Sequence, residues 1–272
     1  MITIIFAPPG FGKTSFLAHT LNMACFNRER NKKMQQEIAQ KKVNGFTKLN
    51  APQHCVSANF DCTFRKFGYS PRHNRTINPY RLGFANKYVK THFTLPFECI
   101  GITEAQKYLN SRMSMYFPDW QSRWYEAHRH NNIDIWLDTQ RPMLIDANIR
   151  ELARFIEIVN LKIKHDKNGK VKSLTWTIRT IENSNLFDTY MASGRKDSTC
   201  YVEQIVEAKY NVFELYDSQS CKHKFYDGNF DEDFDYNVSK PVEQTLDDYI
   251  EYLKNNDDEL PENYYQRRKT SW

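Results

Sequence analysis

The sequence lacks a long hydrophobic run, a leader peptide and closely spaced cysteines. No apolar stretch reaches the length of about 18 residues that a membrane span needs, and the chain begins in an apolar strand without a basic leader. These absences predict a protein that is neither secreted nor membrane-spanning. The six cysteines are widely spaced without a Cys-x-x-Cys pair, so neither a zinc site nor a disulfide framework is indicated and reduced thiols are expected.

Charge is unevenly distributed along the chain. The net charge is +5, but residues 226–272 carry −8, so that residues 1–225 carry +13. A basic body with an acidic tail indicates a polyanionic partner for the body, and a tail that shields that surface or docks elsewhere. Solubility alone explains the same distribution equally well.

The most informative motif lies near the N-terminus. Residues 7–14 read Ala-Pro-Pro-Gly-Phe-Gly-Lys-Thr and follow the apolar run 1–6, which predicts a buried strand. A strand, a glycine-rich loop and a helix together indicate a P-loop, whose backbone N–H groups surround phosphate oxygens. Lys13 is expected to reach the β/γ-phosphates and Thr14 to bind Mg²⁺. The predicted ATP-binding residues are Pro9, Gly10, Phe11, Gly12, Lys13, Thr14 and Ser15. The alternative is a glycine turn beside a surface lysine.

The remaining pattern predicts an α/β domain over residues 1–225. Strands are expected at 55–60, 97–104 and 133–138, and helices at 15–24, 27–42, 105–109 and 146–158. Alternation at 158–163 and 174–179 around the turn 166–169 predicts a β-hairpin at about 158–181. We therefore expect a mainly parallel, RecA-like sheet flanked by helices, an appended hairpin, and an acidic, flexible tail at 226–272.

A basic, aromatic insertion occupies residues 61–92. Seven cationic side chains alternate with aromatic ones, a composition that suits phosphate contacts and base stacking. A surface loop with its aromatic residues in the core has the same composition, so nucleic-acid binding remains one of two interpretations. The cationic residues are Arg65, Lys66, Arg72, Arg75, Arg81, Lys87 and Lys90, and the aromatic ones are Phe64, Phe67, Tyr69, Tyr80, Phe84 and Tyr88.

Four segments in fixed order resemble the zonular occludens toxin-like (Zot) family. They are APPGFGKT, ITEAQKYL, AHRHNNIDIWLDTQ and VFELYDSQSCKH, and they extend over roughly residues 1–225. Family members carry a P-loop, a strand ending in Asp-Glu-Ala-Gln, an Arg-His pair before a strand ending in Thr-Gln, and a final Leu-Tyr-x-Ser segment. The resemblance implies a P-loop ATPase of the FtsK/HerA kind that filamentous phages use in virion morphogenesis and export of single-stranded DNA.

Catalytic candidates follow the two strands that come after the insertion. Glu104 is expected to orient or activate the attacking water. The alternative is a glutamate that stabilises the helix N-terminus by interacting with the helix dipole. Gln140 suits sensing of the γ-phosphate, with a strand-end glutamine bonded to backbone as the alternative. ATP hydrolysis also needs an extra cation, often from a neighbouring subunit, and the candidates are Arg112, Arg129 and Arg150. The histidines beside Arg129 lack the acidic or cysteine neighbours of a zinc site.

Two departures from the family pattern bear on function. Thr103 stands where the family has Asp, so Asp138 or Thr103 is left to order the water shell of Mg²⁺; an alternative role for Asp138 is to cap a turn. Filamentous-phage members usually continue into a transmembrane helix after the ATPase domain, whereas this chain has the acidic tail. We therefore expect no transmembrane segment within the chain itself.

The resulting functional hypothesis is an ATP- and Mg²⁺-dependent motor in a homo-oligomeric ring, with a hexamer as the expected form. It would act in the host cytoplasm, or at the inner face of the cytoplasmic membrane, on phage DNA together with other phage assembly proteins. A soluble genome-packaging ATPase of a tailless phage is the first alternative. A nucleotide-dependent assembly scaffold with weak hydrolysis is the second. Nothing in the sequence indicates toxin activity.

Overall fold

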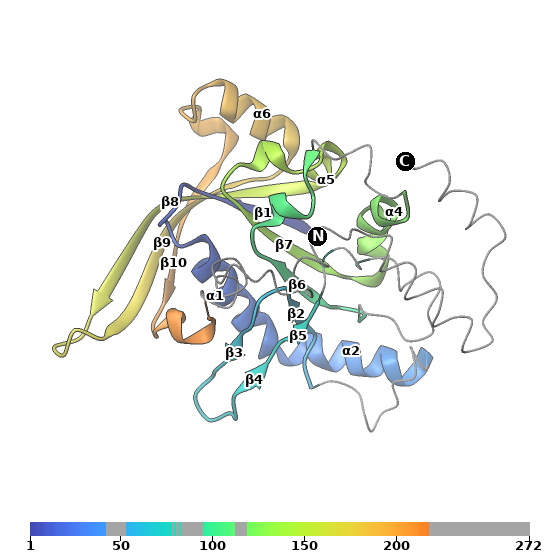
Figure 1. Ribbon diagram of the computed structural model, residues 1–272, viewed down its shortest axis with the longest axis vertical. Coiled ribbons are helices and arrows are strands. Elements are labelled where there is room, and N and C mark those ends of the chain that lie inside the picture. The colour runs from blue at the N-terminus through green and yellow to red at the C-terminus, as the bar shows by residue number, and fades with distance from the viewer. Residues whose placement is uncertain (42–52, 78, 80–81, 83–94, 112–118, 218–272) are drawn as a thin grey trace, which may run out of the picture.

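The chain forms a large mixed sheet covered by helices on both faces (Figure 1), and a separate two-stranded sheet of β3 and β4. The computed structural model describes residues 1–41, 53–77, 79, 82, 95–111 and 119–217. The predicted α/β class with a mainly parallel sheet is confirmed. The strands are β1 (Ile2–Phe6), β2 (Val56–Ala58), β3 (Thr63–Phe64), β4 (Arg72–His73), β5 (Arg75–Thr76), β6 (Cys99–Ile102), β7 (Asp134–Thr139), β8 (Ala153–His165), β9 (Val171–Ile181) and β10 (Val202–Ala208).

Helices connect these strands and cover the sheet. The α-helices are α1 (Lys13–Cys25), α2 (Arg28–Lys41), α4 (Asp119–Ala127), α5 (Ala147–Glu151) and α6 (Ser184–Ala192), and the 3₁₀ helices are η3 (Ala105–Lys107), η5 (His128–Asn131), η6 (Pro142–Leu144), η7 (Ser198–Cys200) and η8 (Val212–Leu215). No helix in the described ranges is long and apolar enough to cross a bilayer.

The sheet has eight strands in the order β10-β9-β8-β1-β7-β6-β2-β5. The strands from β8 to β5 are parallel, while β9 and β10 run antiparallel to their neighbours. In the centre, Ile2 of β1 pairs with Ile135 of β7 on one side and with Ala153 of β8 on the other. Because parallel strands end at the same edge, the loops that follow β1, β6 and β7 meet at the carboxyl edge of the sheet.

Alternation along β1 builds a core on each face. Ile4 and Phe6 belong to the core cluster that contains residues of α4, α5 and α6, whereas Ile5 belongs to the cluster that contains α1 and η8. All three side chains are almost fully buried. Burial on both faces is the environment for which a continuous apolar, β-branched run is suited, and it fixes the direction in which the chain leaves β1.

The helix predicted at 27–42 is confirmed as α2, and one of its faces is buried. Met34 and Ile38 form a small core cluster with Cys55 and Leu95. Asn31, on the same helix, accepts a hydrogen bond from the backbone N–H of Cys55 at 3.2 Å. The mostly charged composition concealed this apolar face, which holds α2 against the start of β2.

The helix predicted at 146–158 is wrong beyond its first turns. Helix α5 ends at Glu151, and β8 begins at Ala153. The residues that follow, Phe155, Ile156 and Ile158, pair with strands β1 and β9 instead. Apolar spacing in such a short run fits either a helix face or a strand buried on both sides, and pairing with β1 decides for the strand. The short helix predicted after Glu104 is also a single 3₁₀ turn, η3.

The predicted hairpin is confirmed and is larger than expected. Strand β8 starts inside the main sheet, where residues 153–157 pair with β1, and the rest of β8 continues past the end of β1 in partnership with β9. Asp166 closes the turn by accepting backbone hydrogen bonds from Asn168 at 2.8 Å and Lys170 at 2.9 Å. Figure 1 shows the resulting projection extending away from the body of the protein.

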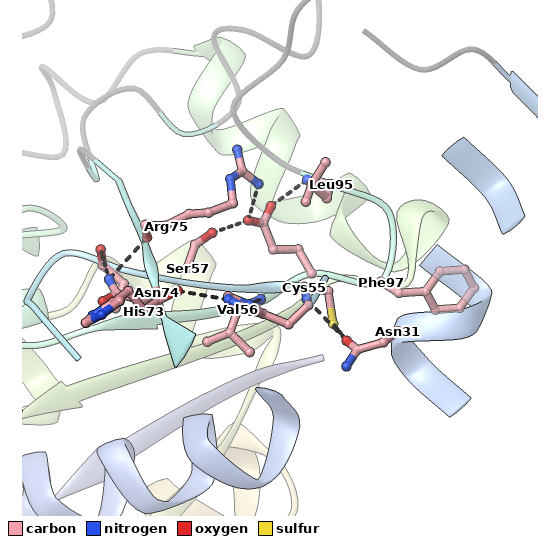
Figure 2. Close-up of polar contacts among 12 residues, drawn as sticks. Asn31, Cys55, Val56, Ser57, His73, Asn74, Arg75, Leu95 and Phe97 are labelled. Carbon is pink, nitrogen blue, oxygen red and sulfur yellow. Dashed lines mark hydrogen bonds and ion pairs between the residues drawn. The ribbon is translucent and has the colours of Figure 1, made fainter. Parts of the chain in front are cut away.

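The insertion at 61–92 adds an edge strand to the sheet, because β5 pairs in parallel with β2. The buried carboxylate of Glu98 contacts both β5 and β2. Glu98 is fully buried, forms an ion pair with Arg75 at 2.8 Å and accepts hydrogen bonds from Ser57 and the backbone of Leu95. Figure 2 shows Ser57, Arg75 and Leu95 gathered around this carboxyl group. Burial raises the pKa of Glu98, while Arg75, Ser57 and Leu95 lower it.

Loss of the Arg75 guanidinium is expected to destabilise the fold. An Arg75→Met variant leaves the buried Glu98 carboxylate without its cation, which costs about 3 kcal/mol of unfolding free energy. The deficit should shrink as the pH falls, because a protonated Glu98 no longer needs a counter-ion. Urea unfolding at several pH values measures both effects. The control is Arg65→Met, since Arg65 and Glu214 form an exposed pair at 3.7 Å whose loss should cost less than about 0.5 kcal/mol.

The cysteines in the described part of the chain are buried and have free thiols. Cys25, Cys55, Cys62, Cys99 and Cys200 are free and buried. Cys221 and the acidic tail at 226–272 lie outside the described residues, so the domain boundary at residue 225 stays a prediction.

Candidate nucleotide-binding site

The loop between β1 and α1 requires glycine at two positions. Gly10 and Gly12 have φ values of 84° and 75°, a left-handed conformation that side chains rarely adopt. Gly12 also has no room for a side chain. A Cβ atom there would lie 2.8 Å from Leu161 Cδ2 and 3.2 Å from Trp176 Nε1, both on the β8–β9 hairpin. The loop is therefore held between its own strand and the hairpin.

The first turn of α1 carries the polar side chains of the motif. Lys13 is nearly buried, and its ammonium donates to the carbonyls of Ala7 at 3.1 Å and Pro8 at 3.2 Å. Burial lowers the pKa of Lys13, and the carboxylates of Asp138 and Glu104 partly offset that effect. Since no acidic residue lies in the first turn of α1, the helix N-terminus presents its N–H groups and the lysine charge to the loop.

Asp138, at the end of β7, joins the loop to the neighbouring strand end. Its Oδ2 accepts hydrogen bonds from the hydroxyls of Thr14 and Thr103, both at 3.0 Å. Its Oδ1 accepts from the backbone N–H of Glu104 at 2.9 Å. Burial raises the pKa of Asp138 to about 6, although these three donors lower it. One buried carboxyl group therefore connects β1, β6 and β7 at the carboxyl edge.

Thr103 and Glu104 occupy the turn that follows β6. Glu104 has a φ of 52°, which is unusual for a residue with a side chain. The contact of its N–H with Asp138 and a hydrogen bond from Gln106 to its carboxylate fix this conformation. Asn59, after β2, donates to the Thr103 carbonyl at 3.2 Å and accepts from the Thr103 N–H at 2.8 Å. The half-buried Glu104 carboxylate is thus positioned from two neighbouring strands.

Of the other predicted residues, Gln140 lies at this carboxyl edge, whereas Arg129 and Arg150 do not. Gln140 follows β7 and is exposed. Arg129 and Arg150 come just before β7 and β8 respectively, at the opposite edge of the sheet. A six-residue strand such as β7 separates its two ends by about 17–20 Å, so Arg129 does not reach the P-loop of its own chain. Arg112 lies outside the described residues.

Most cationic side chains of the insertion have partners within the protein. Arg72 donates to the carbonyl of Cys25 at 3.1 Å, and its guanidinium lies 4.9 Å from the Phe26 ring centre. Lys66 lies 5.5 Å from the ring centre of Tyr69. With the pairs of Arg65 and Arg75 already described, these side chains stabilise the loop. Arg81, Lys87 and Lys90 are outside the described residues, so nucleic-acid binding by this segment stays a prediction.

Three residues at the site carry no sequence signal that identified them in advance. Asn59 orients Thr103 from a third strand, while Leu161 and Trp176 face Gly12 from the hairpin. Asn59 follows a short apolar strand, as polar ligands of α/β sheets commonly do, and that position was its only indication. Nothing in the local sequence of Leu161 or Trp176 relates either of them to the loop near the N-terminus.

Comparison with known proteins gives one match to a family model. The model described as zonular occludens toxin (Zot) matches residues 1–223. Among curated proteins no sequence matches the chain.

Several solved structures are similar to this one at low sequence identity. The N-terminal domain of zonular occludens toxin from Neisseria meningitidis is 20% identical, with a TM-score of 0.46 over 79% of this chain and 98% of that chain. The genome packaging NTPase B204 from Sulfolobus turreted icosahedral virus 2, in complex with ATP-gammaS, is 12% identical, with a TM-score of 0.35 over 68% and 92%. The DNA-packaging ATPase B204 from Sulfolobus turreted icosahedral virus is 11% identical, with a TM-score of 0.36 over 75% and 95%.

Proposed function

The chain belongs to the zonular occludens toxin (Zot) family, and on that premise we propose that it is a P-loop ATPase that drives the assembly of a phage particle. The observation that carries the proposal is the contact of Asp138 with Thr14 and with the Thr103–Glu104 turn. These hydrogen bonds bring a phosphate-binding loop, a hydroxyl, an acid and a candidate base together at one edge of the sheet. That combination is what phosphoryl transfer to water requires.

Oxygen donors at the site suit Mg²⁺. The Thr14 hydroxyl would bind the ion directly, and Asp138 would hold its water shell, since Mg²⁺ prefers oxygen ligands and retains several waters. No group of three His, Cys, Asp or Glu side chains in the described part of the chain forms a metal cluster, so nucleotide oxygens would complete the shell. When bound, the ion would neutralise charge that develops on the phosphates. In this proposal Asp138 orders the water shell of Mg²⁺, the role that the family pattern gives to an Asp at position 103.

Each of the other site residues has a defined task in this proposal. The Lys13 ammonium would exchange the carbonyls of Ala7 and Pro8 for phosphate oxygens, which are stronger acceptors. The backbone N–H groups of residues 10–15 would surround the phosphate chain. Glu104 would orient the water that attacks the γ-phosphate, and Gln140 would contact that phosphate from the end of β7.

A homo-oligomeric ring would complete the site. Arg129 and Arg150 lie at the amino edge of the sheet, so they would serve the P-loop of a neighbouring subunit rather than their own. A cation supplied in trans stabilises the transition state of many related ATPases. In its biological role the ring would move or hand over phage DNA in the host cytoplasm, together with other assembly proteins.

Substitution of Glu104 tests whether the protein hydrolyses ATP or only binds it. We expect Glu104→Gln to lower steady-state ATP turnover by about 100-fold, because an amide cannot accept the proton or align the water. Binding of a fluorescent ATP analogue should be retained, and Lys13→Ala should weaken that binding. Glu151→Gln is the matched control, because Glu151 is exposed and lies just before β8 at the amino edge.

Turnover and binding together separate the hypotheses. Normal turnover of the Glu104→Gln protein would remove Glu104 from the mechanism. Tight binding of ATP without measurable turnover of the wild-type protein would contradict the motor and leave an assembly scaffold.

A further inference from the structure

The β8–β9 hairpin presents a row of exposed cationic side chains beyond the carboxyl edge of the sheet. Strand β1 ends opposite Glu157, whereas β8 continues to His165 with β9 as its only partner along most of that stretch. Every residue from 162 to 170 is exposed. The cationic residues of the projecting part, here called the hairpin tip, are Lys162, Lys164, Lys167, Lys170 and Lys172, with His165 beside them.

The charge of the hairpin tip is not neutralised by acidic neighbours. In the described ranges no ion pair joins any of its lysines to a carboxylate. The only acid of the turn, Asp166, is engaged by the backbone N–H groups of Asn168 and Lys170. The arginines of the insertion differ in this respect, since Arg65 and Arg75 are paired with carboxylates. Uncompensated lysines that project together attract a polyanion.

The base of the same hairpin packs on the P-loop. Leu161 and Trp176 pair across β8 and β9 and, together with Ser15, leave no room for a Cβ at Gly12. Trp176 is fully buried and stacks on His19 of α1 with ring centres 5.4 Å apart. Lys164 lies three positions after Leu161 in extended chain, which corresponds to about 10 Å. The base of the hairpin is therefore in contact with both the loop and the first helix.

We propose that the hairpin tip binds the sugar-phosphate backbone of DNA, and that Leu161 and Trp176 transmit this contact to the P-loop. The assignment rests on the proposed ATPase function and adds to it the surface that holds the nucleic acid. Five exposed lysines on one projection supply the cationic groups that neutralise backbone phosphates. No Phe, Tyr or Trp occurs between residues 159 and 175, so we expect the hairpin tip to contact phosphates and its affinity to depend little on base sequence.

Removal of three tip lysines tests the binding surface. Fluorescence anisotropy with a labelled oligothymidylate, in the absence of nucleotide, compares wild type with the triple variant Lys164→Gln, Lys167→Gln and Lys170→Gln. We expect the affinity at 0.1 M salt to fall on the order of 100-fold, and the slope of log K against log salt to fall by about 2 to 3. The control removes three exposed charges elsewhere, Lys32→Gln, Lys33→Gln and Arg123→Gln. A duplex of matching length, run in parallel, shows which form of DNA binds better.

The outcomes distinguish this proposal from the proposed ATPase. Equal affinity and equal salt slope in the two triple variants would overturn the assignment of the hairpin tip, while ATP turnover of the wild type would still support the enzyme. Conversely, a wild-type protein without ATP turnover contradicts the enzyme, yet the nucleotide-free anisotropy measurement still reports on the hairpin.

Leu161 variants test the transmission step. We expect Leu161→Ala to retain DNA affinity but to reduce the ratio of DNA-stimulated to unstimulated ATP turnover by at least about threefold, because a shortened side chain leaves a gap beside Gly12. Leu161→Met keeps the volume and should restore the ratio. An unchanged ratio in Leu161→Ala, or wild-type turnover that does not respond to DNA, would contradict the transmission.

Discussion

Asp138→Asn is expected to reduce Mg²⁺-dependent ATP turnover by about 100-fold or more, because the variant loses the carboxylate charge proposed to hold the metal's water shell. The fold should persist. An asparagine carbonyl can still accept from the Glu104 N–H, and its amide can donate to the rotatable hydroxyls of Thr14 and Thr103. The substitution therefore removes charge with little change in hydrogen bonding. When ATP turnover is measured over a range of Mg²⁺ concentrations, the rate of the Asp138→Asn variant should depend less on Mg²⁺ than the wild-type rate.

Thr103→Ala is the control for this experiment. It removes one hydrogen bond to Asp138 Oδ2 and keeps the carboxylate, so turnover should fall by less than about tenfold, in line with the roughly 1 kcal/mol of one neutral hydrogen bond. If Asp138→Asn and Thr103→Ala lose activity to the same small extent, Asp138 acts only as a cap of the turn after β6. That outcome would also leave the protein without a metal-ordering acid at this edge.

Gly12→Ala is expected to disrupt both the fold around the loop and nucleotide binding. The methyl group would meet Leu161 Cδ2 and Ser15 Oγ at 2.8 Å, and the residue would keep an unfavourable positive φ. Together these effects should cost roughly 3 kcal/mol of unfolding free energy. Because the loop or the hairpin must shift, the affinity for a fluorescent ATP analogue should fall on the order of 100-fold. Urea unfolding without nucleotide and analogue titration measure the two effects separately.

Gly10→Ala provides the matched comparison. Gly10 has a similar φ of 84°, but a Cβ there has no neighbouring atom within 4 Å. Its replacement should cost about 1 kcal/mol, from backbone conformation alone. Similar unfolding free energies of the two variants would mean that the hairpin side chains beside Gly12 move at little energetic cost. The proposed transmission from the hairpin tip to the loop would then lose its structural basis.

Sequence reasoning located the P-loop because all of its requirements are local. A buried strand, two glycines and the Lys13-Thr14 pair are consecutive, and the structure places Gly10 and Gly12 at positive φ as that motif demands. The same reasoning failed at 146–158, where a short apolar run is compatible with either element. Pairing with β1, which lies far away in the sequence, decided for a strand.

Asp138, the acid proposed to order the metal's water shell, shows the same limit. Asp138 was weighed as a turn cap and as a substitute for an acid at position 103, and the local pattern did not separate the two. Its hydrogen bonds to Thr14, Thr103 and the Glu104 backbone fix the turn after β6, and its role toward a metal stays a proposal. These hydrogen bonds depend on the order of β1, β7 and β6 in the sheet.

The sequence by itself determined the glycine-rich loop between a strand and a helix, the α/β class and the family, because each depends on consecutive residues or on a fixed order of short motifs. Only the tertiary structure decided that Asp138 contacts Thr14, that Arg129 and Arg150 lie at the amino edge of the sheet, and that the hairpin packs against Gly12. Those relationships join residues that are distant along the chain. They are set by strand order and register, which arise from burial and pairing over the whole sheet rather than from any local pattern.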